Sequence, residues 1–152
     1  MAVVATKAYL SLIVRLVLAA AFILAALPKI QDPVAFAASV EGFRVVGGEL
    51  TQWVALLLPW FELVIGLGLL VPQLRLGSGL IIGVLLVAFI GLHLSAWLRG
   101  LDISCGCFGP ETGDTAPNYL WLLGRNFALL LAVIFIFRRD LRNMPPIRVD
   151  PL

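Results

Sequence analysis

Cys105 and Cys107 are the two cysteines of this chain, and a single residue, Gly106, separates them. Their Cα atoms can come within the roughly 4.4–6.8 Å that a disulfide needs if the chain bends, and glycine bends easily. Such a bridge closes a loop of about three residues, so the chain-entropy estimate gives only ~1.5 kcal/mol of stabilisation. Since strained, exposed disulfides are the labile and catalytic ones, the pair predicts reversible thiol–disulfide chemistry.

Two other interpretations of these cysteines stay open. They could be inert free thiols, or they could supply half of a metal site that a partner completes, because two thiolates are too few for a closed zinc site. Redox chemistry is favoured because the pair lies in a polar, turn-rich segment, Ser104 to Pro110, between very hydrophobic stretches. We expect no metal to be bound by the chain itself.

The composition is that of a membrane protein. Of the 152 residues, 61% are hydrophobic and 13% are charged, and the mean hydropathy is +1.04. Soluble domains are nearer half apolar and about a quarter charged. The net charge is only +2, so nucleic acid is not an expected partner.

Four stretches are long enough to cross a bilayer, which takes about 20 apolar residues in a helix. The predicted spans are residues 8–27, 53–71, 77–98 and 119–137. We therefore expect an all-α integral membrane protein in which a bundle of four transmembrane helices forms a single domain over residues 1–152. A basic tail, residues 138–152, follows the last span.

Basic residues near the ends of the spans predict the orientation in the membrane. The tail contains four arginines, and Lys7 and Arg75 lie at the same predicted side, whereas basic residues on the other side are diluted by acidic ones. Both termini are therefore expected in the cytoplasm of a bacterial-type plasma membrane. The cysteines are then expected outside, where disulfides persist.

The first outer loop, residues 28–52, contains a stretch from Val34 to Phe43 with apolar residues near helical spacing. Asp32 and Pro33 are suited to the cap and the first position of a helix. We expect a short amphipathic helix at the outer surface. It could cover the cysteine segment or simply fill the space between two spans.

Charged residues within spans cost about 2.5–3.5 kcal/mol each on insertion scales, so they usually face the interior of a bundle. Here they are Arg15, Glu62 and Arg125. A rise of about 1.5 Å per residue puts Glu62 and Arg125 at similar depths. We expect Glu62 to pair with Arg125, with Arg15 as a rival partner, and such a pair could fix helix register or line a functional site.

Residues in the outer half of the spans could hold a quinone head group. His93 and Trp97 share a helix face at i, i+4 spacing, and so do Trp121 and Arg125. His93 could donate a hydrogen bond to a head-group oxygen, and Arg125 could stabilise its charge. Tryptophan is also an ordinary interfacial anchor, and His93 could be a core residue whose hydrogen bonds are satisfied.

Several motifs together resemble the MauE family (methylamine utilisation protein E), within the wider DoxX-like group of small four-helix membrane proteins. They are Arg15, Pro28-Lys29, Pro59 with Glu62, Cys105-Gly106-Cys107-Phe108-Gly109 and Leu123-Gly124-Arg125-Asn126. The Cys-Gly-Cys-Phe-Gly element followed by Arg-Asn is the specific part.

The resemblance implies a membrane-associated redox role. The MauE family is linked to forming or protecting disulfides in an exported dehydrogenase subunit, together with a thioredoxin-like partner. The expected function is therefore a membrane thiol–disulfide oxidoreductase that exchanges electrons between an exported thioredoxin-like or disulfide-containing protein and membrane quinone.

Two alternative functions stay open. DoxX-like relatives are associated with thiol stress and with thiosulfate:quinone oxidoreduction, so the chain could be a subunit of that kind. It could also be a non-catalytic subunit or assembly factor of a larger membrane complex, or a homo-oligomer surrounded by membrane lipid.

Overall fold

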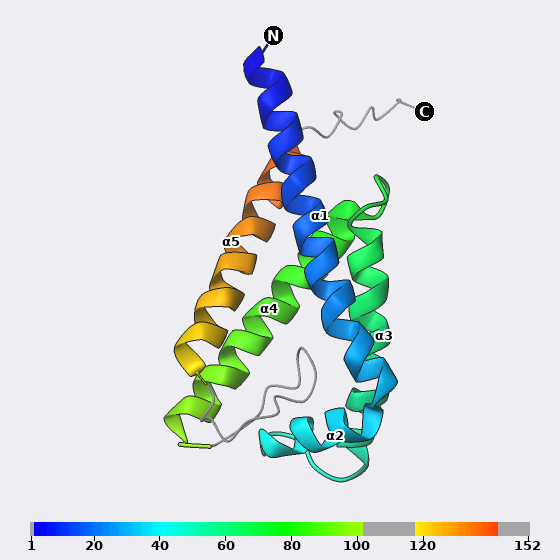
Figure 1. Ribbon diagram of the computed structural model, residues 1–152, viewed down its shortest axis with the longest axis vertical. Helices are drawn as coiled ribbons and strands as arrows, with labels where there is room; N and C mark the ends of the chain where they lie inside the picture. Colours follow the sequence, from blue (N-terminus) through cyan, green and yellow to red (C-terminus); the bar gives the residue numbers. More distant parts are fainter. Residues whose placement is uncertain (1, 102–117, 143–152) are drawn as a thin grey trace, which may run out of the picture.

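The computed structural model describes the backbone of residues 2–101 and 118–142, with side chains from residue 9 onward. Cys105, Cys107 and the tail after Arg142 lie outside the described residues. Five helices are present in the described part: α1 (Ala2–Gln31), α2 (Pro33–Gly42), α3 (Glu49–Gly68), α4 (Arg75–Leu98) and α5 (Tyr119–Arg142) (Figure 1).

Four of these helices are long and apolar enough to cross a membrane: α1 from Tyr9 onward, α3, α4 and α5. Large hydrophobic side chains on their outer faces are exposed, as lipid-facing residues are; Val64 is 62% exposed and Leu131 is 67% exposed. The prediction of an all-α, four-span membrane bundle is confirmed, and the chain is a multi-pass membrane protein.

Helices α1 and α5 continue past the C-terminal ends predicted for them. In α1 the amide of Asp32 donates to the carbonyl of Pro28 at 3.0 Å, so the helical pattern continues past the proline to Gln31. Helix α5 continues to Arg142. As a result Lys29 and Asp140, which the sequence analysis left outside the spans, belong to spanning helices.

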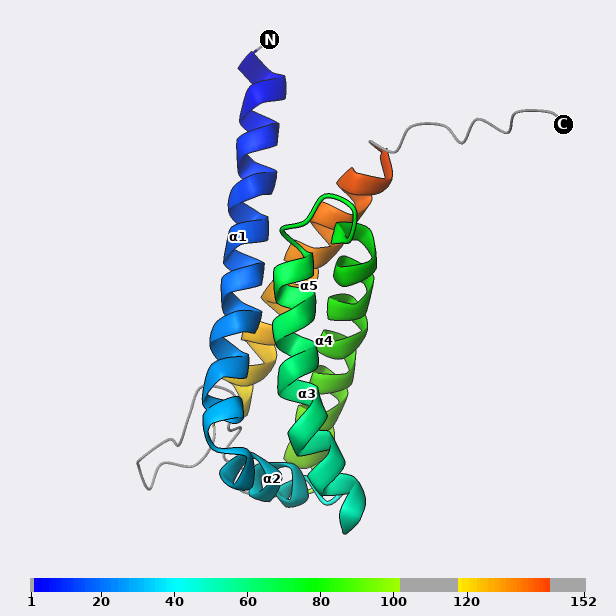
Figure 2. The same ribbon diagram turned by 90° about the vertical axis from the view of Figure 1, so that its right-hand side faces the viewer.

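The four spanning helices form a ring in which each packs on two neighbours (Figures 1 and 2). Helix α1 packs on α3 and α5, and α4 packs on the same two helices. Helix α1 begins and α5 ends at one end of the bundle, here called the terminal end. The opposite end carries α2 and is called the α2 end.

The inner faces of the helices follow a seven-residue repeat. Most buried side chains are three, four or seven residues apart, the spacing typical of left-handed coiled coils. In α5, for example, they are Leu122, Asn126, Val133, Ile136 and Asp140. The middle of the bundle is a purely apolar layer made by Leu18, Phe22, Ile65, Leu69, Ile82, Leu86, Val133 and Ile136.

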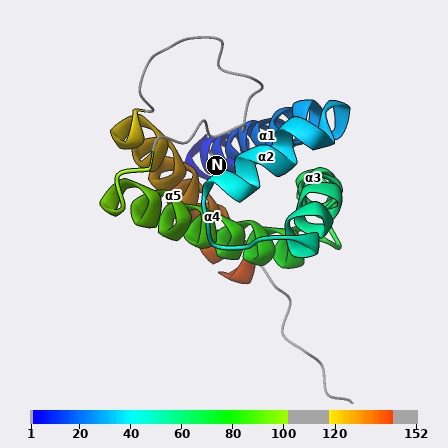
Figure 3. The same ribbon diagram turned by 90° about the horizontal axis from the view of Figure 1, so that it is seen from below.

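The predicted short helix of the first loop is confirmed as α2. Asp32 caps it, because its Oδ1 accepts a hydrogen bond from the amide of Ala35 at 2.9 Å, and Pro33 occupies the first turn. The helix lies across the end of the bundle and buries Phe36 (Figure 3). Arg99, at the end of α4, donates from Nη1 to the carbonyl of Phe43 at 3.1 Å, which ties α2 to α4.

Helices α1 and α3 approach closely at Gly66. A Cβ atom built there would lie 3.2 Å from Cγ1 of Ile23 and 3.3 Å from Cβ of Phe22. We predict that Gly66→Leu destabilises the bundle by about 1–3 kcal/mol, the usual cost of overpacking. Reversible unfolding in mixed micelles measures the change. Gly91→Leu is the matched control, since nothing lies within 4 Å of a Cβ at that position; equal losses would contradict a close α1–α3 contact.

Candidate functional site: a polar cavity at the α2 end

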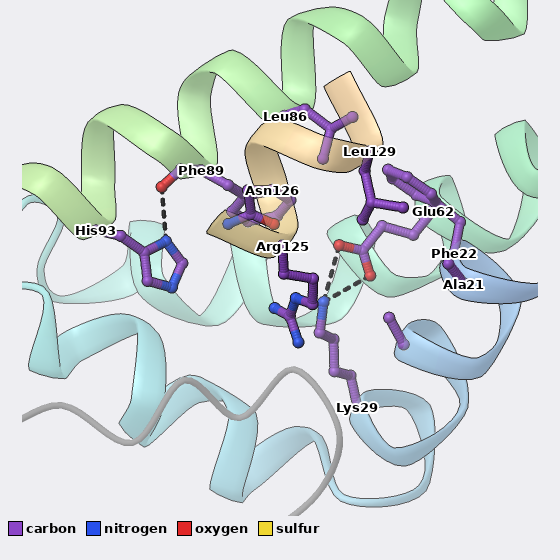
Figure 4. A pocket seen from close by; sticks show the side chains of 11 residues that line it. Ala21, Phe22, Lys29, Glu62, Leu86, Phe89, His93, Arg125, Asn126 and Leu129 are labelled. Carbon is purple, nitrogen blue, oxygen red and sulfur yellow. Dashed lines mark hydrogen bonds and ion pairs between the residues drawn. The ribbon is translucent and has the colours of Figure 1, made fainter. Parts of the chain in front are cut away.

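Polar side chains from all four spanning helices meet in one cavity at the α2 end (Figure 4). They are Lys29 of α1, Glu62 of α3, His93 of α4, and Arg125 and Asn126 of α5. Apolar residues such as Phe22 and Leu129 complete the lining. A cluster of this kind within membrane-spanning helices is expensive, and such clusters are usually retained for function.

A fully buried ion pair is the centre of this cavity. Nζ of Lys29 lies 2.8 Å from Oε1 and 2.7 Å from Oε2 of Glu62, and both side chains are only 2% exposed. The same ammonium lies 5.0 Å from the ring centroid of Phe36 in α2 and 5.7 Å from that of Phe89 in α4. Through cation–π attraction the ammonium of Lys29 therefore also contacts α2 and α4.

The expected partners of Glu62 were wrong. Its carboxylate pairs with Lys29 rather than with Arg125 or Arg15 in the part of the chain that the structure describes. The reason is that α1 continues through Pro28 and carries Lys29 onto its inner face, where the ammonium reaches both oxygens. Arg125 lines the same cavity and lies beside Lys29.

Arg15 instead pairs with Asp140, and both side chains are buried. This pair joins α1 to α5 toward the terminal end. Lys29 follows Arg15 by 14 residues, and Asp140 follows Asn126 by the same number, which is two seven-residue repeats. The two ion pairs therefore lie roughly 20 Å apart along the bundle, with the apolar layer between them. This spacing is the sequence signal that could have identified Lys29 and Asp140.

His93 is held in a fixed orientation. Its Nδ1 lies 2.6 Å from the carbonyl oxygen of Phe89, and because that oxygen can only accept, Nδ1 carries a hydrogen and donates it. The ring of Phe43 packs edge-on at 5.5 Å between centroids. His93 is thus a titratable group whose ring is positioned by α4 itself and by Phe43, the residue that follows α2.

Asn126 has an unused donor in the cavity. The side chain is only 5% exposed, and Nδ2 has no hydrogen-bond partner among the described residues. A buried polar group left in this state costs about 1–3 kcal/mol, so the position favours a bound acceptor.

A second, apolar cavity lies between α2 and the spanning helices and adjoins the polar one. The polar cavity has a volume of about 50 Å³ and the apolar one about 270 Å³. Lys29, Phe89 and His93 line both, and Phe36, Val40 and Phe43 form the wall on the side of α2. An apolar chamber with a few polar groups at one end is the usual form of a small-molecule site.

The four residues predicted to hold a quinone are only partly brought together. His93 and Arg125 line the polar cavity, whereas Trp97 is 47% exposed, Trp121 is 67% exposed, and neither lines either chamber. On α4 and α5 it is their sequence neighbours, Ala96 and Leu122, that are buried. The tryptophans therefore face outward, where this residue commonly anchors helices at the membrane interface.

The segment that contains the cysteines connects two helices at the α2 end of the bundle. Helix α4 ends and α5 begins at the α2 end, and the hydroxyl of Tyr119 donates to the carbonyl of Leu101. Cys105 and Cys107 follow Leu101 in the sequence and lie outside the described residues.

Comparison with known proteins finds one family. The family model described as methylamine utilisation protein MauE matches residues 7–138. The methylamine utilization protein MauE of Paracoccus denitrificans is 33% identical over 123 residues, which cover 80% of this chain and 65% of that protein. The protein of the same name from Methylorubrum extorquens is 34% identical over 110 residues, covering 71% of this chain and 58% of that protein.

A third relative, the methylamine utilization protein MauE of Methylophilus methylotrophus, is 35% identical over 100 residues, covering 65% of this chain and 50% of that protein. The chain thus spans about half to two thirds of the length of the curated relatives it matches. No solved structure matches it significantly.

The buried pair predicts strong coupling between Lys29 and Glu62. Lys29→Met and Glu62→Gln should each cost about 3–5 kcal/mol of unfolding free energy, because each leaves its partner buried without a counter-charge. The double variant should cost much less than the sum, as a double-mutant cycle in mixed micelles would measure. Arg15→Gln should add independently to Glu62→Gln, since those sites share no partner. Additive losses for Lys29 and Glu62 would contradict the pair.

Proposed function

The chain belongs to the MauE family, and from this premise we propose that it is a membrane thiol–disulfide oxidoreductase of methylamine utilisation. Its reactive groups are Cys105 and Cys107. The observation that carries the proposal is the polar cavity built by all four spanning helices at the end of the bundle where α4 and α5 flank the cysteine segment.

The proposed reaction has two halves. In the first, two thiols of an exported thioredoxin-like or substrate protein are oxidised to a disulfide while the Cys105–Cys107 disulfide is reduced to two thiols. A thiolate attacks a disulfide sulfur, and a mixed disulfide is the intermediate. In the second half, the dithiol is reoxidised and a membrane quinone takes up the two electrons and two protons.

The two adjoining cavities support a quinone as the acceptor. A quinone head group is a flat ring with a hydrogen-bond acceptor oxygen at its edge. Nδ2 of Asn126 and the ammonium of Lys29 are donors at the polar end, and the chamber beneath α2 offers apolar walls for the ring. Within this site Arg125 supplies positive charge near a reduced oxygen, and His93 is the titratable group beside it.

The orientation of the protein is part of the proposal. We assign both termini to the cytoplasm and the cysteine segment to the outside, in the plasma membrane of a bacterium. Arg75, Arg138, Arg139 and Arg142 lie toward the terminal end, which supports that assignment by the positive-inside rule. Thioredoxin-like proteins in the exported space would then meet the α2 end.

An assembly role in a larger membrane complex is the second candidate. It is favoured by the names of the relatives, which describe a process, methylamine utilisation, rather than a reaction. In that case the polar residues of the cavity would only fix the register of the helices, and the protein would not oxidise dithiols.

The first prediction from this proposal concerns the cysteines. Cys105 and Cys107 should form a disulfide that opens and closes reversibly when membranes are equilibrated in glutathione buffers. A membrane-impermeant maleimide should trap two thiols per chain under reducing conditions in intact cells, and none under oxidising conditions. Cys105→Ser and Cys107→Ser are the controls: each should give one thiol under reducing conditions, and its remaining cysteine can form a mixed disulfide with glutathione but no disulfide within the chain. Two reactive thiols at all potentials would leave only the assembly role, and labelling only after permeabilisation would reverse the orientation.

The second prediction concerns the acceptor. Reduced protein mixed with a soluble quinone analogue should reduce it with single-turnover kinetics that require both cysteines. Asn126→Leu should slow this step by about tenfold, because a hydrogen bond to the head group is worth roughly 1–1.5 kcal/mol. Trp97→Phe and Trp121→Phe should leave the rate unchanged, since neither side chain lines the cavities. If the tryptophan variants slowed quinone reduction and Asn126→Leu did not, the quinone would bind on the outer face of the bundle instead.

A further inference from the structure

A groove on the outer face of α4 and α5 is separate from the polar cavity. It lies toward the terminal end, has a volume of about 510 Å³, and is lined almost entirely by apolar side chains. Gly79 and Gly83 contribute the α4 side of its floor, and Val133 contributes the α5 side. Because the glycines have no side chains, α4 leaves an open channel between larger neighbours such as Val84 and Leu130.

The length of the groove corresponds to one leaflet of a bilayer. On α5 it extends from Leu130 to Leu141, which is roughly 16 Å at 1.5 Å per residue. Half of a hydrocarbon core of about 30 Å is nearly the same length. An extended acyl chain therefore fits along the channel, with its polar end at the end of α5.

The polar end of the groove is cationic. Arg138 lines it, Arg142 lies one turn further along α5, and Arg75 lies one turn before Gly79 on α4. None of these three arginines is in an ion pair within the described part of the chain. Asp140, the acidic residue nearest to them on α5, is already paired with Arg15.

From this geometry we propose that the groove is a binding site for an anionic glycerophospholipid. One acyl chain lies between α4 and α5, and the phosphate is held by Arg138 together with Arg75 and Arg142. Basic pockets between transmembrane helices are suited to such lipids, and each arginine near an anionic head group contributes a similar share of the binding free energy. The site is independent of the cysteines and of the quinone, so it stands or falls separately from the proposed function.

The test is native mass spectrometry of the full chain, released from bilayers that contain equal parts of phosphatidylglycerol and phosphatidylcholine. The wild-type monomer should retain one phosphatidylglycerol in preference to phosphatidylcholine. Arg138→Gln should lower that preference about fivefold. Arg44→Gln is the matched control, since it removes an exposed arginine in the loop after α2, at the other end of the molecule, and should leave the preference intact.

A second pair of variants tests the channel itself. Gly83→Leu fills the groove and should remove the retained lipid whatever its head group, whereas Gly91→Leu, on the same helix but outside the groove, should not. Equal retention of both lipids by the wild type would overturn the preference for an anionic head group. Unchanged retention in Gly83→Leu would overturn the site, and a wild-type dimer that Gly83→Leu converts to a lipid-free monomer would show that a second copy occupies the groove.

Discussion

The buried ion pair of Lys29 and Glu62 is the constraint on which the α2 end depends. An ammonium inside the bundle cannot be left alone, since removing one partner of such a pair typically costs about 3–5 kcal/mol. The carboxylate of α3 and the rings of Phe36 and Phe89 together surround this one charge. The contact between Lys29 and Phe36 therefore helps to hold α2 against the end of the bundle. Lys29 also lines both chambers of the candidate site.

The two buried ion pairs also give the bundle its rotational register. Apolar side chains pack nearly as well against lipid as against each other, so hydrophobic contacts alone select weakly among helix rotations. Lys29–Glu62 fixes α1 against α3, and Arg15–Asp140 fixes α1 against α5. The apolar layer lies between the two ion pairs and keeps their charges apart, so that each basic residue contacts only its own carboxylate.

Local features of the sequence predicted the helices, whereas the contacts between helices needed information that local patterns lack. Length and hydropathy gave the four spans, and Asp32-Pro33 gave the start of α2. The partner of Glu62 was missed because the first span was predicted to end at residue 27, whereas α1 continues to Gln31 and includes Lys29. The i, i+4 spacing places His93 and Trp97 on one side of α4, yet only His93 faces the cavity. Trp97 is exposed, because the buried face of α4 continues through Ala96 instead.

The sequence separations of the two ion pairs have a consequence for biosynthesis. Lys29 and Glu62 are 33 residues apart, so their contact can close as soon as α3 has left the insertion machinery, and α1 and α3 can enter the bilayer as a neutralised hairpin. Arg15 and Asp140 are 125 residues apart and lie in α1 and α5. That pair cannot form until α5 has been made, so during synthesis the guanidinium of Arg15 waits for its partner much longer than the ammonium of Lys29 does.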